Sequence, residues 1–198
     1  MTFVNRRYKG QFRVRRNRTI PLLFYGLISL LCIAHIALGD SEMSDAQKKE
    51  TIYDLYAGYK KDFPAVKDIS PQQGMELLNQ GTVVFVDTRK PAEMAVSMLP
   101  GAVSKQDFLS HPDQYKDKAA VCYCTISYRS CVFACEMAKQ GITVVNLKGG
   151  ILAWILEGGK VYDKNGKEVK RVHVYGDKWN YAPAGYESIK FSLWKQLF

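Results

Sequence analysis

Residues 82–87 have the sequence TVVFVD, a nearly continuous apolar run. Such a run is typical of a strand that is buried on both faces of a sheet. Residues 119–123 and 142–147 repeat the pattern, and stretches with helical spacing, 130–140 and 150–157, lie between and after them. Strands that alternate with helices predict an α/β fold, in which a mainly parallel sheet carries helices on both faces.

Two further elements are predicted on the N-terminal side of this run. Ser70 and Pro71 form an N-cap with proline at the first helical position, so a helix is expected over 71–79 after a short strand at 66–69. Residues 42–62 place apolar side chains at helical spacing and predict an amphipathic helix.

The positive charge of the chain is concentrated at its N-terminus. The formal net charge is +9, but seven of the 28 basic residues and none of the 19 acidic ones lie within residues 1–19. The rest of the chain has 21 basic against 19 acidic residues, a net charge of +2. This nearly neutral body lacks the excess positive charge that binding along a phosphate backbone requires, so nucleic acid is not an expected partner.

Residues 20–39 carry no charge and are rich in Leu and Ile. A helix of this length reaches about 30 Å, which is enough to span a bilayer. Because basic residues flank only its N-terminal end, we expect an inner-membrane anchor with the following domain on the non-cytoplasmic, periplasmic side. Two alternatives stay open: a signal peptide cleaved near Gly39, which would give a secreted protein, and a mitochondrial presequence.

The composition therefore predicts five successive segments: a basic head (1–19), a transmembrane anchor or signal segment (20–39), a helical linker (40–65), an α/β domain (66–157) and an aromatic-rich C-terminal extension (158–198). In the extension, Asn165-Gly166 lies between strand-like runs and predicts a hairpin. Ile189, Leu193 and Leu197 are spaced by four, which predicts a helix over 188–198.

One junction between a strand and a helix gathers reactive groups. Residues 121–130 have the sequence VCYCTISYRS. A cysteine at the end of a buried strand, here Cys124, faces backbone N–H groups and the positive end of the next helix, an environment that lowers a thiol pKa. Arg129 adds a permanent cation whose planar fork suits an oxyanion. The pair is therefore a candidate nucleophile and anion-binding group.

The other cysteines favour simpler interpretations. Cys122 lies within the predicted strand as a core residue, and Cys131 and Cys135 are one helical turn apart, where they would pack the helix on the sheet. The cysteine spacing is not that of a zinc site and the three histidines are scattered, so no metal site is expected.

Several motifs of residues 66–157 resemble, in order and spacing, those of the single-domain rhodanese family of sulfurtransferases. They are Asp87-Thr88-Arg89 for the family's D-x-R, Pro91-Ala92-Glu93 for P-x-E, Leu99-Pro100-Gly101-Ala102 for I-P-G-A, Cys124 to Ser130 for the loop C-x-x-G-x-R-S, and residues 147–154 for L-x-G-G-x-x-A-W.

The resemblance implies transfer of sulfane sulfur without a metal or organic cofactor. The Cys124 thiolate would take the outer sulfur of a small anionic donor such as thiosulfate, become a persulfide, and pass that sulfur to cyanide or a thiol acceptor. Arg129 would orient the donor, and Asp87 and Arg89 would brace the loop from behind. The remaining loop residues would contact the substrate or the persulfide: Thr125, Ile126, Ser127, Tyr128 and Ser130.

One departure from the family pattern leaves alternatives open. Ser127 stands where the family loop has glycine, and a positive φ there would strain a serine. A weakly active or inactive rhodanese-like binding module is therefore a second hypothesis. A cysteine phosphatase or arsenate reductase is a third, although such enzymes need a C-x5-R loop and only four residues separate Cys124 from Arg129.

Overall fold

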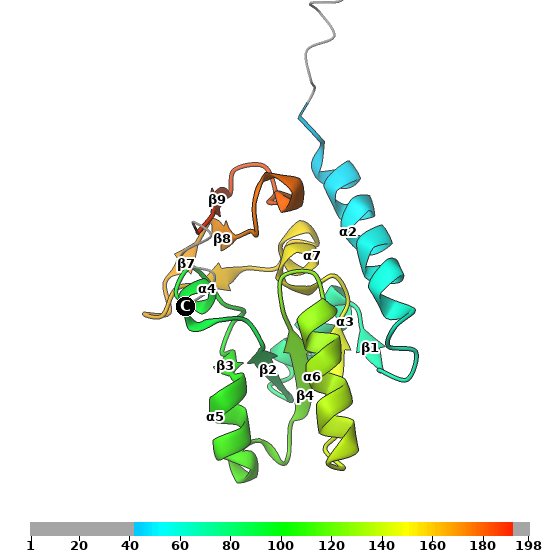
Figure 1. Ribbon diagram of the computed structural model, residues 1–198. Helices are drawn as coiled ribbons and strands as arrows, with labels where there is room; N and C mark the ends of the chain where they lie inside the picture. The colour runs from blue at the N-terminus through cyan, green and yellow to red at the C-terminus, as the bar shows by residue number, and fades with distance from the viewer. Residues whose placement is uncertain (1–41, 192–198) are drawn as a thin grey trace, which may run out of the picture. The chain divides into compact units, whose positions relative to one another are not determined.

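The computed structural model describes residues 42–191 (Figure 1). The predicted basic head and the predicted membrane or signal segment, 1–19 and 20–39, lie outside the described residues. Within residues 42–191, no helix combines the length and the apolar character needed to cross a membrane.

Five parallel strands form the central sheet, in the order β1-β5-β4-β2-β3. They are β1 (Asp68–Ile69), β2 (Val83–Asp87), β3 (Val103–Ser104), β4 (Ala119–Tyr123) and β5 (Val145–Leu147). Strands β2 and β4 pair along their whole length, with Asp87 opposite Tyr123. The carboxyl ends of the strands therefore meet at one edge of the sheet, the usual position of a ligand site. The predicted parallel sheet is confirmed.

Helices cover both faces of this sheet because the side chains of its central strands alternate between two cores. Val83 and Phe85 pack with α3 (Pro71–Asn79) and α7 (Gly150–Leu156). Val84 and Val86 pack on the opposite face with α5 (Lys105–Ser110) and α6 (Tyr128–Lys139). Two short helices, α4 (Pro91–Met94) and η1 (Pro112–Tyr115), complete the domain.

The amphipathic helix predicted within 42–62 is present as α2 (Asp45–Lys60). Ser44 and Gln47 form a capping box that satisfies backbone N–H groups at its start. Ile52 is fully buried in the same core as α7. The helix is thus a part of the packed body of the protein.

The C-terminal extension also packs onto this body. The predicted hairpin is confirmed as β6 (Val161–Tyr162) and β7 (Glu168–Val169), which pair antiparallel around the Asn-Gly turn. Beyond it, β8 (Arg171–His173) pairs parallel with β9 (Glu187–Ile189), and the short helix η2 (Asp177–Trp179) lies between them in sequence (Figure 1).

The predicted helix over 188–198 is wrong at its start. Ser188 and Ile189 belong to β9 and pair with Val172 and His173 of β8. The spacing of four matched a helix, but pairing with a strand distant in sequence decides the backbone conformation there. Residues 192–198 lie outside the described residues.

Side chains of α2 and of the domain fix the extension in place. The buried Lys48 Nζ donates a hydrogen bond to Ala182 O at 3.0 Å, and Ala184 N donates to Asp45 Oδ1 at 2.8 Å. Arg171 Nε donates to Val96 O at 3.1 Å. Residues from both ends of the described chain thereby meet over the carboxyl edge of the sheet.

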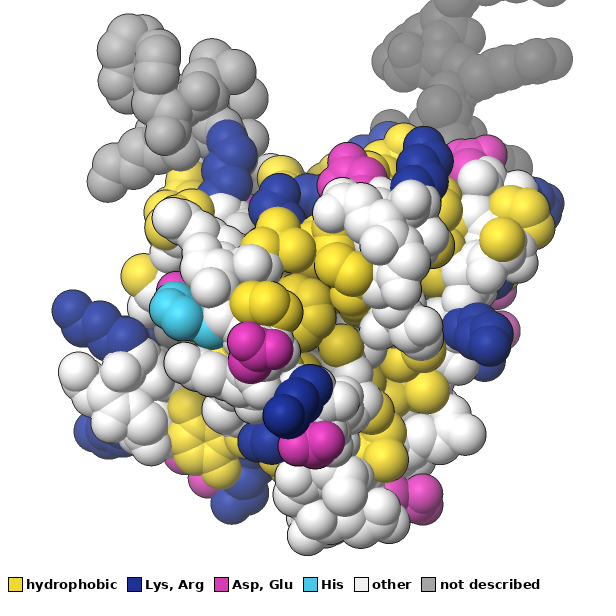
Figure 2. Space-filling view, turned by 90° about the horizontal axis from the view of Figure 1, so that it is seen from below, with side chains coloured by type: hydrophobic (Ala, Val, Ile, Leu, Met, Phe, Trp, Pro, Cys, Tyr) yellow, Lys and Arg dark blue, Asp and Glu magenta, His cyan; other side chains and the backbone are white. Residues whose placement is uncertain are grey.

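Charged side chains are interspersed by sign on the face seen in Figure 2, where basic and acidic groups surround apolar ones. The view agrees with the nearly neutral composition of the chain after residue 19. It offers no uniformly basic surface on this face for a polyanion.

Candidate active site

The loop between β4 and α6, residues 124–127, lies at the carboxyl edge of the sheet and is almost fully buried. Ile151 N donates to Cys124 O at 2.9 Å, which holds the loop against the start of α7. This approach requires Gly150, because a Cβ there would lie 2.4 Å from Cys124 O and its φ is +60°. The Gly-Gly pair of the sequence therefore fixes the position of Cys124.

Ser127 occupies the left-handed region, with φ 85°, and within residues 42–191 it is the one non-glycine residue with positive φ. Its hydroxyl donates to Leu147 O at 2.8 Å in a fully buried position. Ser127 therefore has the positive φ that is usual for glycine. Its buried hydrogen bond offsets part of the backbone strain that this φ causes in a serine.

Ser130, like Ser127, holds the loop from behind. Its Oγ lies 2.9 Å from Ser127 O and 2.7 Å from Asn146 Oδ1, and it is fully buried. Neither serine belongs to the lining of the pocket described below. Both hydroxyls are turned to backbone and side-chain partners in the interior, and the role of these two residues toward the substrate stays a prediction.

Asp87 and Arg89 form a second buried support. Arg89 donates to the Asp87 carboxylate from Nε at 2.9 Å and from Nη2 at 2.6 Å, and both side chains are fully buried. The Tyr123 hydroxyl donates to Asp87 Oδ2 at 2.5 Å, and Thr88 N donates to Tyr123 O at 3.0 Å. These contacts hold Tyr123, the residue immediately before Cys124, and the bracing role that the family resemblance implies for the pair stays a prediction.

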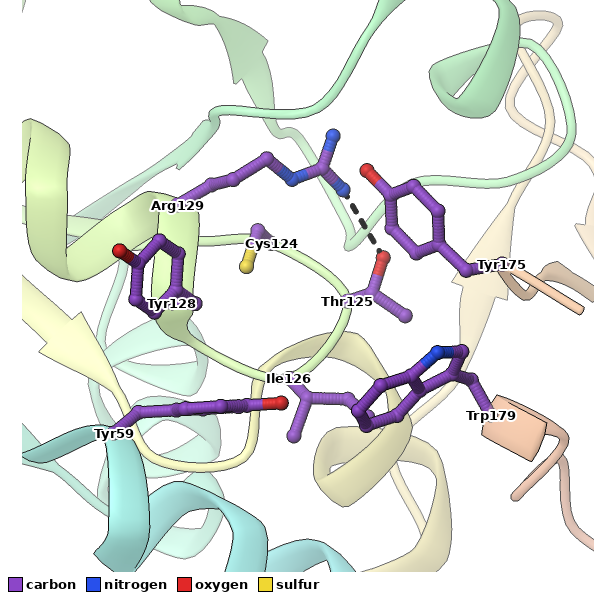
Figure 3. A pocket seen from close by; sticks show the side chains of 8 residues that line it. All are labelled: Tyr59, Cys124, Thr125, Ile126, Tyr128, Arg129, Tyr175 and Trp179. Carbon is purple, nitrogen blue, oxygen red and sulfur yellow. Dashed lines mark hydrogen bonds between the residues drawn. The ribbon is translucent and has the colours of Figure 1, made fainter. Parts of the chain in front are cut away.

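A pocket of about 490 Å³ opens beside the loop (Figure 3). Five of its lining residues belong to the predicted loop and helix start, and the other three come from α2 and the C-terminal extension. The lining residues are Tyr59, Cys124, Thr125, Ile126, Tyr128, Arg129, Tyr175 and Trp179. The structure thus brings the predicted nucleophile and the predicted cation into one cavity.

Arg129 is held by a partner that sequence reasoning missed. Its Nη1 and Nη2 donate to the two carboxylate oxygens of Glu93, at 2.7 and 2.9 Å, and Nη2 also donates to Thr125 Oγ1 at 3.2 Å. Glu93 is only 2% exposed and belongs to the P-x-E motif. The P-x-E motif singles out Glu93 in the sequence, but no local sequence pattern relates it to an arginine 36 positions later.

The buried carboxylate is charged at neutral pH. Burial by itself would raise the pKa of Glu93, but the hydrogen-bonded Arg129 guanidinium and the adjacent His173 outweigh it and hold this pKa well below its usual range. His173 Nδ1 lies 3.1 Å from Glu93 Oε1, and His173 is 1% exposed. The extension therefore supports Arg129 indirectly, through Glu93.

Aromatic side chains from outside the predicted 66–157 domain form two walls of the pocket. Tyr59 of α2 lies beside Tyr128, with ring centroids 5.5 Å apart, and Tyr175 and Trp179 lie on the other side (Figure 3). The Arg129 guanidinium lies 5.0 Å from the Tyr175 ring centroid. Sequence reasoning noted the aromatic richness of the extension but gave no contact between it and the loop.

The other described cysteines lie away from the pocket lining. Burial raises the pKa of the Cys131 thiol to about 12 and that of Cys122 well above its ordinary value. Both are therefore protonated thiols at neutral pH, and both pack in the core between the sheet and α6. Cys124 is the one cysteine of residues 42–191 that reaches the cavity.

Comparison with known proteins matches residues 70–157 to the rhodanese-like domain. A protein named sulfurtransferase from Allochromatium vinosum is 34% identical over 93 residues, which cover 45% of this chain and 87% of that protein. The chain belongs to the rhodanese-like family. The thiosulfate sulfurtransferase GlpE of Ectopseudomonas mendocina is 37% identical over 94 residues, which cover 44% of this chain and 84% of that protein.

The rhodanese-like region also occurs in a relative with another name. The tRNA uridine(34) hydroxylase of a Synechocystis strain is 33% identical over 97 residues, but the match spans only 35% of that protein. The helix α2 and the extension, which complete the pocket here, lie outside the 70–157 match.

Proposed function

We propose that this protein is a rhodanese-type sulfurtransferase that carries sulfane sulfur as a persulfide on Cys124. The observation that carries the proposal is the position of Cys124: it directly follows β4, precedes the first turn of α6, and lines a cavity that also holds Arg129. The first N–H groups of a helix have no intrahelical partner, and with the helix dipole they favour an anionic sulfur.

The reaction needs two displacements at sulfur. In the first, the Cys124 thiolate attacks the outer sulfur of a thiosulfate-like donor, a new S–S bond forms, and the old S–S bond breaks with its electron pair leaving on sulfite. In the second, a thiol acceptor as thiolate, or cyanide, attacks the outer sulfur of the persulfide and restores the Cys124 thiolate.

Arg129 positions the donor through a limited number of N–H groups. Of its five, two are used by Glu93 and one by Thr125. The two that remain, on Nε and Nη1, have no partner among residues 42–191 and can donate to an anionic oxygen in the pocket. The pair with Glu93 fixes the plane of the guanidinium, and this fixes the direction of the remaining donors.

Mass spectrometry of the full chain after treatment with thiosulfate tests this function. One sulfur atom should add about 32 Da to the peptide that contains Cys124, and cyanide should remove it as thiocyanate. The cyanide step is the control, because a sulfinic acid has the same nominal mass gain and is not reversed in this way. A chain that gains no cyanide-removable sulfur from any donor would instead support the inactive binding module.

We further propose that residues 20–39 anchor the protein in an inner membrane, with the rhodanese-like domain on the non-cytoplasmic side. The uncharged run and the basic residues before it support this placement. Fractionation of cells that express the full chain should find it in the membrane pellet and accessible to protease only after the outer compartment is opened. A shortened chain in the soluble fraction would show cleavage near Gly39.

A further inference from the structure

The pocket is large for a small inorganic sulfur donor. Its volume of about 490 Å³ falls within the range of roughly 300–1,000 Å³ that holds organic ligands of moderate size. Thiosulfate has five heavy atoms and would leave most of this space to water. The space around Cys124 therefore suits a donor or acceptor with an organic body.

The walls of this space are flat and apolar. Tyr128 and Tyr175 keep 48% and 40% of their surface exposed, although both line a cavity and contact other aromatic side chains. Burial raises the pKa of Tyr175 to about 12, so its ring is uncharged at neutral pH. Aromatic rings placed around an open space favour a ligand group that can stack between them or lie edge to face.

The charge of the lining is small. Arg129 is the one charged side chain among the eight lining residues, and the buried Glu93 carboxylate offsets its charge through two hydrogen bonds. A dianion such as thiosulfate would lose its hydration without meeting a full positive charge. A monoanion with an apolar body would lose less hydration and gain contacts with the rings.

From these observations, which rest on the proposed function, we infer that the preferred sulfur donor is an organic monoanion whose body is aromatic or similarly flat and apolar, bound between Tyr59 and Tyr128 on one side and Tyr175 and Trp179 on the other. Tyr175 and Trp179 are then specificity-determining residues contributed by the extension. The reacting group is an outer sulfur that bears the negative charge, as in a thiosulfonate or an organic persulfide.

Two thiosulfonates form a matched pair of probes, because benzenethiosulfonate and methanethiosulfonate share the reacting group and the single negative charge. With either one, the Cys124 thiolate attacks the outer sulfur, the S–S bond to the sulfonyl group breaks, and a sulfinate leaves with the electron pair. The ratio of their kcat/KM values, divided by the same ratio for a free thiol in solution, isolates the effect of the pocket on the organic body.

In the full chain this corrected ratio should favour benzenethiosulfonate by about tenfold, because ring contacts of about 1.4 kcal/mol correspond to that factor. Tyr175→Ala and Trp179→Ala should each reduce the ratio severalfold, because each removes a ring that would contact the organic body. Leu109→Ala is the control, since Leu109 is 43% exposed and lies outside the pocket lining. It should leave the ratio unchanged.

A corrected ratio near one, with cyanide-removable sulfur still formed on Cys124, would overturn the inference and leave the proposed function intact. Calorimetry on the Cys124→Ser chain covers the opposite case. In this variant, which cannot carry sulfur on residue 124, benzenesulfonate should bind measurably more tightly than methanesulfonate. This result would support the pocket assignment even if no donor transfers sulfur, so the binding measurement is independent of the proposed function. Equal binding of the two sulfonates would contradict the inference.

Discussion

The two sides of the Cys124 loop differ in how they are built. Behind the loop, Ser127, Ser130 and the Asp87–Arg89 pair are fully or almost fully buried, and their polar groups bind other groups of the protein. In front of it, the Glu93–Arg129 pair is buried at the carboxylate but 28% exposed at the arginine, beside exposed aromatic rings. The back of the loop fixes where the sulfur lies, and the front decides what can reach it.

The largest expected effect is a loss of stability when Asp87, behind the loop, is replaced. Asp87→Ala leaves the Arg89 guanidinium buried without its partner, and breaking a buried pair in this way costs about 3–5 kcal/mol of unfolding free energy. Urea titration of the full chain measures the loss. Glu168→Ala is the control, because it removes an exposed pair with Lys160 and should leave the unfolding free energy nearly unchanged. Equal losses in the two variants would contradict a bracing role for Asp87.

The next largest effect is a fall in kcat/KM when Arg129, in front of the loop, is replaced. Arg129→Lys keeps a positive charge but loses the fork, so kcat/KM for thiosulfate should fall about tenfold. Arg129→Ala also exposes the Glu93 carboxylate to the anionic donor, and the fall should reach about a hundredfold. Steady-state kinetics measure both. Unchanged kcat/KM in both variants would remove Arg129 from the site.

Two substitutions of Ser127, behind the loop, separate the effect of backbone strain on stability from the effect of the side-chain hydrogen bond. Ser127→Ala keeps the positive φ and loses the bond to Leu147 O, so it should lower the unfolding free energy by about 1 kcal/mol. Ser127→Gly also loses the bond but relieves the strain, so it should be more stable than the alanine variant. Thermal melts compare the two, and an alanine variant as stable as glycine would refute the strain argument.

The smallest effect is a dependence of stability on pH. The pKa of Glu93 is lowered in the folded chain, so its ionised form stabilises the fold above the unfolded value of about 4.3, and this contribution is lost as pH falls toward the folded value. The difference in unfolding free energy between the wild type and Glu93→Gln should stay constant from pH 7 to about 5 and shrink below about pH 4. A difference that grows on acidification would have the wrong sign.

The sequence predicts most of the back of the loop because its signals are local. The apolar runs of β2 and β4 and the Gly-Gly pair each fix a conformation within a few residues. The comparison of Ser127 with the glycine of related loops also marks this position as strained if its φ is positive, and the φ of Ser127 is 85°.

The front is harder to predict because its contacts join segments distant in sequence. Glu93 meets Arg129 only after β2 and β4 have paired, and Tyr59 meets Tyr128 only after α2 has packed beside α6. Spacing patterns carry no information on such contacts. For the same reason Ile189, which fits a helical repeat, is held in β9 by its pairing with His173.

The most direct test of the central claim compares four single variants of the full chain, each with one serine in place of Cys122, Cys124, Cys131 or Cys135. The measurement is the rate of thiocyanate formation from thiosulfate and cyanide, with circular dichroism to confirm folding. We predict that Cys124→Ser abolishes the rate, because Cys124 alone among these lines the cavity, and that the other three variants retain most of it. A folded Cys124→Ser chain that still forms thiocyanate, or an equal loss in another folded variant, would contradict the assignment of Cys124 as the sulfur carrier.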